Sequence, residues 1–83
     1  MVSSMYTLAK IITLRSGANL IDGNTFTGIP VAPPRIGYPF RIINGKIVRV
    51  TSTVLKITPH PVHLNKEIIE TTNAIYHLTK LRS

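Results

Sequence analysis

The chain has 83 residues, of which 43% are hydrophobic and 16% charged, so we expect one small globular domain over residues 1–83 and neither a disordered nor a multidomain protein. Ten basic and three acidic residues give a formal net charge of +7, which favours a polyanionic partner. The lack of cysteine excludes disulfides and thiol chemistry, and no apolar stretch approaches the ~20 residues of a membrane-spanning helix.

The first predicted element is a strand within residues 6–15, which are apolar and rich in β-branched side chains. Ala9 and Ile11 interrupt its alternation, so a short amphipathic helix is the alternative. The residues before Asp22 include Ser, Lys and Arg but no acid, which loosely resembles a transit peptide. A first strand is the preferred interpretation, because so small a domain has little chain to lose.

A turn at Asp22-Gly23-Asn24 precedes a second predicted strand over residues 24–31. Four prolines fall within residues 29–39. Because proline removes a donor from the hydrogen-bond ladder, it is confined to strand edges and loops. We therefore expect this stretch to be a semi-rigid extended connection with some polyproline II character.

The strongest local signal is Asn44-Gly45, which lies between the β-branched runs 41–43 and 46–58. Such a pair predicts a β-hairpin, since both residues tolerate the positive φ of a type I′ turn. The second run changes its alternation midway, so we expect a bend or bulge near Ser52-Thr53. A bend there would let one long strand take part in two sheets of a small barrel.

Two more strands are predicted over residues 66–72 and 74–81, with a turn at Thr72-Asn73. A single helix over this region is the alternative. Five or six short strands indicate a mostly β protein. We expect a small antiparallel barrel or half-barrel of five to six strands, SH3-like or OB-like.

Two segments share a pattern with other chains. Residues 51–57 and 71–78 fit T-S-x-V-x-x-I … T-x-N-S-x-Y-x-L, except that Ala74 replaces the serine. Residues 37–40 also resemble the lead-in of such chains. Together these segments resemble small uncharacterised β proteins of phages and mobile elements, over about half of the chain. The resemblance implies a viral or phage-like protein and no particular activity.

Catalytic and metal-binding arrangements are few. Glu67 and Glu70 have opposite strand parity, so they are expected to face apart and not to form a carboxylate pair. His60, His63 and His77 are interpreted as exposed loop histidines, because no other residues support a metal site. The sequence thus predicts no enzyme activity, cofactor or metal; a small histidine-dependent nuclease is the least favoured alternative.

Basic and aromatic residues make up the candidate ligand-binding site: Arg35, Tyr38, Arg41, Lys46, Arg49 and Lys56. Single-strand-binding barrels combine a basic groove with aromatic residues on which bases stack. Strand parity places Arg41 with Ile43, and Arg49 with Thr51, on what we expect to be one polar outer face.

These observations predict a non-catalytic basic protein that binds an anionic partner, nucleic acid or a nucleotide. A phage-type origin would make it an accessory or anti-defence factor in the host cytoplasm, without membrane association. The main alternative is an oligomeric interaction or inhibitory module that docks through a strand edge, for example on an acidic host protein. A homodimer is expected in either case, because so small a core benefits from self-association.

Overall fold

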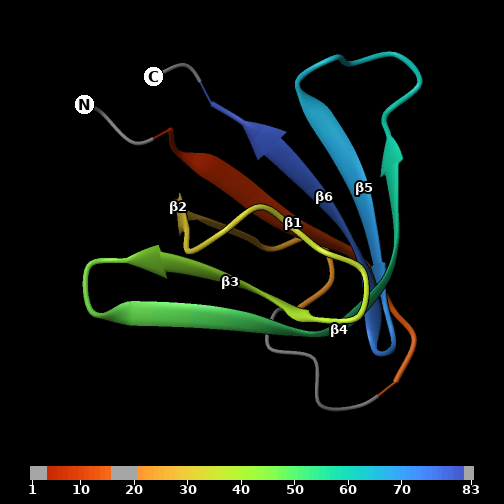
Figure 1. Ribbon diagram of the computed structural model, residues 1–83, viewed down its shortest axis with the longest axis horizontal. Helices are drawn as coiled ribbons and strands as arrows, with labels where there is room; N and C mark the ends of the chain where they lie inside the picture. The colour runs from red at the N-terminus through yellow and green to blue at the C-terminus, as the bar shows by residue number, and fades with distance from the viewer. Residues whose placement is uncertain (1–3, 16–20, 82–83) are drawn as a thin grey trace.

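The computed structural model describes residues 4–15 and 21–81. These residues form six strands and no helix (Figure 1): β1 (Tyr6–Thr13), β2 (Thr25–Pro30), β3 (Pro39–Asn44), β4 (Ile47–Pro59), β5 (Lys66–Thr71) and β6 (Ala74–Lys80). Each strand pairs antiparallel with the next, and β6 pairs with β1, so the sheet closes into a barrel. The predicted small antiparallel barrel is confirmed, and the helical alternatives for the first and last segments are wrong.

The long strand β4 joins the two halves of the barrel. Its first half pairs with β3 as far as Thr53, and its second half pairs with β5 from Val54 onward. Register irregularities flank this change of partner, as expected for a strand that bends. Figure 1 shows the β3–β4 hairpin running in a different direction from β1, β6 and β5. The predicted bend near Ser52-Thr53 is therefore confirmed.

A register shift between Lys10 and Ile12 explains the broken alternation in β1. Leu8 and Lys10 point into the barrel and are buried, whereas Ile12 beyond the shift is 48% exposed. A bulge of this kind exchanges the two faces of the strand. As a result, Ile12 lies on the exterior, whereas Lys10, before the shift, keeps the interior position that its parity with Leu8 predicts.

The barrel interior is filled by apolar side chains from five of the six strands: Leu8, Phe40, Ile42, Val54, Ile69, Ala74, Tyr76 and Leu78. Each is almost completely buried. Burial raises the pKa of the Tyr76 phenol above its usual value, because a low-dielectric surrounding disfavours the phenolate. Phe40 and Tyr76 are thus core residues and are not available for stacking with a ligand.

The predicted hairpin is present, but its turn lies one residue later than predicted. Asn44 pairs with Ile47, so the two central residues are Gly45 and Lys46. Gly45 has φ 61°, and no non-glycine residue in the described ranges has a positive φ. A positive φ at the first central position alone is typical of a type II′ turn, so the type I′ assignment is wrong. Asn44 remains in the strand, where its amide donates to the Thr27 carbonyl at 2.9 Å.

We expect Gly45→Val to lower the free energy of unfolding by about 1–3 kcal/mol, the usual cost of a sparsely populated backbone conformation. An added Cβ at this position would meet no atom within 4 Å, so the Cβ itself causes no overlap and the strain lies in the backbone conformation. Urea denaturation measures it. Lys46→Val is the control, because that turn position has a negative φ. A Gly45→Val protein as stable as this control would show that the turn does not hold its conformation.

Candidate functional site

The connection between β2 and β3 ends in a turn that is fastened to the middle of β4. The Tyr38 amide donates to the Arg35 carbonyl at 3.3 Å. The Gly37 amide donates to the Val54 carbonyl at 2.8 Å, and the Val54 amide donates to the Tyr38 carbonyl at 3.0 Å. Gly37 has φ 94°, a conformation that glycine adopts without steric cost. The backbone of Tyr38 is thus held by hydrogen bonds although its side chain is 55% exposed.

The Arg35 guanidinium stacks on this exposed ring. Its central carbon lies 4.8 Å from the centroid of the Tyr38 ring, within the range of a cation–π contact. The contact places a permanent positive charge beside an accessible aromatic surface. Stacking area and charge together are what a nucleotide requires.

Arg35 and Tyr38 line a shallow cavity of about 220 Å³, which we call the Tyr38 groove. The groove is formed by the β2–β3 connection and the start of β3, and its walls include Val31, Pro33, Arg35, Tyr38, Pro39 and Arg41. Three of the six predicted ligand-binding residues are therefore brought together in one groove.

The other three predicted residues lie elsewhere. Lys46 is exposed in the β3–β4 turn, and Lys56 is exposed in the second half of β4, opposite Glu70 of β5. Arg49 pairs across the hairpin with the buried Ile42, and directly paired residues share a face of the sheet.

Arg49 therefore lies on the inner face, and the predicted common outer face with Arg41 is wrong. Its guanidinium carbon lies 5.3 Å from the centroid of the Phe26 ring. Its Nε is buried and has no hydrogen-bond partner among the residues that the structure describes. Thr51 also points inward, where its hydroxyl accepts a hydrogen bond from the Phe40 amide at 3.0 Å.

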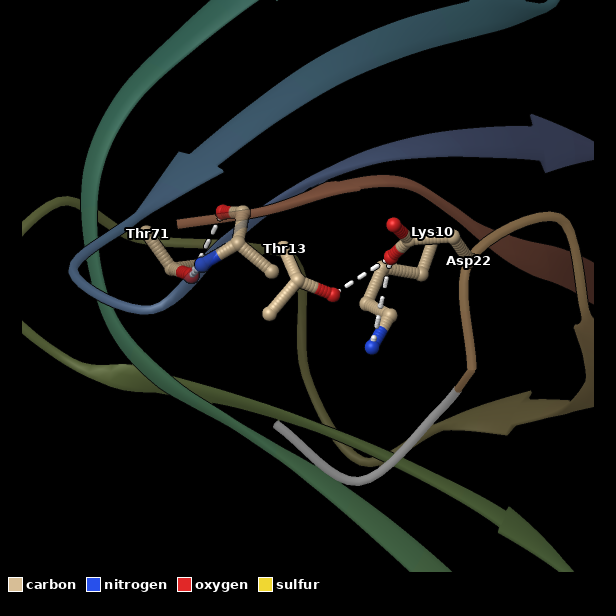
Figure 2. Close-up of polar contacts among 5 residues, drawn as sticks. Lys10, Thr13, Asp22 and Thr71 are labelled. Atoms are coloured by element: carbon tan, nitrogen blue, oxygen red, sulfur yellow. Dashed lines mark hydrogen bonds and ion pairs between the residues drawn. The ribbon is translucent and has the colours of Figure 1, made fainter. Parts of the chain in front are cut away.

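An ion pair between the buried Lys10 and the exposed Asp22, at one end of the barrel, was not predicted (Figure 2). Lys10 is 3% exposed, and its Nζ lies 3.5 Å from the Asp22 carboxylate. Thr13 donates a hydrogen bond to the same carboxylate. The hydrogen bond from Thr13 contributes most to lowering the pKa of Asp22 below its usual value. The positive charge of Lys10 also lowers this pKa, whereas desolvation partly opposes both effects. The signal in the sequence was weak: Lys10 shares its strand parity with Leu8.

The three histidines form a cluster, with ring centroids 5.0 Å apart for His60 and His63 and 5.5 Å apart for His60 and His77. The Nδ1 atom of His60 accepts hydrogen bonds from the Val62 and His63 amides, both at 3.1 Å. Desolvation, followed by the charges of His63, His77 and Lys66, lowers the pKa of His60. Through these two hydrogen bonds, His60 stabilises the loop after β4.

The interpretation as exposed loop histidines thus holds for His63, whereas His60 lies in the loop but is half-buried, and His77 lies in β6 and is half-buried. Within the described ranges, no group of three or more histidine, cysteine or acidic side chains is placed to hold a metal ion. Glu67 pairs with the buried Leu78 and Glu70 with the half-buried Ile75, so the two carboxylates face apart as predicted.

No protein-family model, curated protein or solved structure matches the chain. The part of the chain that the structure describes contains no helix long and apolar enough to cross a membrane.

Proposed function

We propose that the protein binds single-stranded nucleic acid in the Tyr38 groove, without catalysing a reaction. The observation that supports this is the accessible Tyr38 ring, which Arg35 contacts and beside which Arg41 lines the same groove. A base would stack on the ring while the two guanidinium groups contact the neighbouring phosphates. The net charge of +7 attracts such a strand from a distance.

The hydrogen bonds around Tyr38 support the same proposal. They hold the backbone of the turn before any ligand arrives, so little ordering is required on binding. Stacking of one base on an aromatic side chain contributes about 1–3 kcal/mol, whereas the phosphate contacts make the affinity depend on salt. Stacking does not distinguish bases, so this groove by itself would accept any sequence.

Fluorescence anisotropy with a labelled thymidine oligonucleotide tests the proposal. We expect Tyr38→Ala to weaken binding about 5- to 100-fold, which corresponds to the loss of one stacked base. Arg41→Glu should weaken it at least as much and reduce its salt dependence. Lys56→Glu makes the same change of charge at an exposed site outside the groove, and it should have a clearly smaller effect.

Circular dichroism would show whether Arg41→Glu and Lys56→Glu are folded. If both folded variants lose the same amount of affinity for the oligonucleotide, the protein attracts the strand by its charge and has no defined binding site. If the wild-type protein binds no oligonucleotide at low salt, the proposed function is wrong.

A second candidate is an interaction module that associates with itself or with another protein. The outer face of β2, β3 and β4 supports it, because Ile29 and Val48 both pair with Ile43 and form an apolar row across the three strands. Ile29 is 42% and Val48 46% exposed. Since the barrel is closed, docking would use this side-chain face and not a strand edge. Self-association insensitive to salt, in sedimentation velocity, would favour this candidate.

Within either candidate, the role of a phage-type accessory or anti-defence factor in the cytoplasm stays a prediction from the resemblance alone. Sequestration of a host nucleic acid is the activity that the first candidate would provide.

A further inference from the structure

We infer that a second cavity, at the mouth of the barrel, binds a guanine base of the same strand, and that Glu67 recognises its Watson–Crick edge. This inference rests on the proposed function. The cavity measures about 470 Å³, which lies within the usual range of ~300–1,000 Å³ for small-molecule sites. It opens between β1, β5, β6 and the β2–β3 connection, and its walls include Tyr6, Pro30, Val31, Pro33, Glu67 and Leu78.

The cavity is largely apolar, but Glu67 supplies a carboxylate. Glu67 pairs with the buried Leu78, which places its side chain on the inner face of the barrel, and it is half-buried. Among the described residues, its carboxylate has neither a hydrogen bond nor an ion pair. A base that enters the cavity would displace water from this half-exposed carboxylate, so it must bring N–H groups that replace the lost donors.

The chemistry of an ionised carboxylate selects among the bases. It has two acceptor oxygens and no donor. Guanine presents two adjacent donors, N1–H and the N2 amino group, so it can satisfy both oxygens at once. Adenine and cytosine place an acceptor nitrogen next to their single amino group, and thymine flanks its N3–H with two carbonyls. In those three bases a lone pair would face the carboxylate, which is repulsive.

The position of the cavity connects it with the Tyr38 groove. Val31 and Pro33 line both, so the two sites lie on either side of one loop. A strand crossing this loop can stack one base on Tyr38 and insert a nearby base into the cavity. The prolines of the loop limit its conformational freedom, which reduces the entropy lost when the base enters. The groove would thus supply affinity for any strand, and the cavity would supply the choice of base.

The test compares a thymidine oligonucleotide with the same oligonucleotide carrying one central guanine, inosine, adenine or cytosine. The wild-type protein should bind the guanine oligonucleotide about 5- to 100-fold more tightly than the others, the range expected for one bidentate contact to a base. Inosine, which lacks the N2 amino group, should lose most of this preference. Because this comparison changes only the oligonucleotide and uses the wild-type protein throughout, its result does not depend on whether a variant folds.

Glu67→Gln should remove the preference for guanine and leave binding of the thymidine oligonucleotide unchanged or slightly tighter. Glu70→Gln removes the same charge on the other face of β5, and it should retain the preference. Equal affinity of the wild-type protein for all five oligonucleotides would overturn the inference and leave the proposed function standing. Absence of binding to every one of them would overturn both.

Discussion

Gly28→Ala is expected to lower the free energy of unfolding by about 3 kcal/mol or more, or to prevent folding altogether. A Cβ at position 28 would lie 2.3 Å from the carbonyl oxygen of Ile43 and 2.8 Å from its carbonyl carbon. Both are backbone atoms of β3, so no side-chain rotation can relieve the overlap. Relief requires β2 and β3 to separate where they pair, at Ile29 with Ile43 and Pro30 with Ile42.

Chemical denaturation with a fluorescent or circular dichroism signal measures this loss. Gly45→Ala is the matched control, because the added Cβ meets no atom within 4 Å and only the backbone conformation is strained. The control should therefore be clearly more stable than Gly28→Ala. Total stabilities of small domains are about 5–15 kcal/mol, so a loss of this size is easily detected. A Gly28→Ala protein with the midpoint of the wild type would mean that β2 and β3 do not approach so closely.

Thr71→Val, although nearly isosteric, should cost about 2–4 kcal/mol. Thr71 is completely buried, and its hydroxyl makes two hydrogen bonds to the backbone of Ala74 (Figure 2). It donates to the Ala74 carbonyl at 2.7 Å and accepts from the Ala74 amide at 3.1 Å. Valine would leave both backbone groups buried without these partners, and each unsatisfied group costs about 1–3 kcal/mol.

Thr71→Ser separates the hydroxyl from the methyl group. Serine keeps both hydrogen bonds and loses one buried methyl, so we expect a cost of about 1 kcal/mol. Thermal and urea denaturation measure the stability of the three proteins. A stability that decreases from the wild type to Thr71→Ser and then to Thr71→Val would confirm that the hydroxyl stabilises the β5–β6 turn. If valine is tolerated better than serine, packing of the methyl group is the dominant contribution.

Features encoded by neighbouring residues were predictable from the sequence. The hairpin at Asn44-Gly45 and the bend in β4 both arise from short segments, so they could be recognised without tertiary information. The exact turn could not, because Asn44 is kept in β3 by a hydrogen bond to Thr27 of another strand. Burial of Lys10 likewise depends on Asp22, which lies beyond the end of β1.

In the candidate site, too, local features were predictable, whereas features that depend on distant segments were not. Arg35 and Tyr38 lie within one turn, so their proximity follows from local sequence. Parity within a single strand does not determine which of its faces meets a given face of the neighbouring strand, so the predicted outer face for Arg49 was wrong. Antiparallel pairing across a two-residue turn sets Arg49 opposite Ile42, on the face opposite to Arg41. The cavity at the mouth of the barrel, which Glu67 lines, forms only when the barrel closes, so no local sequence pattern could predict it.

The order of the strands has a consequence for how the chain folds. Among the described residues, five strand pairings join neighbours in the sequence, and one, between β1 and β6, joins the two ends of the chain. The hairpins can form locally, whereas the pairing of Tyr6 with Lys80 closes a loop that includes all the strands in between. The entropy lost in bringing the ends together is compensated only when this last pairing completes the interior. We therefore expect the β1–β6 pairing to form late, as the step that closes the barrel.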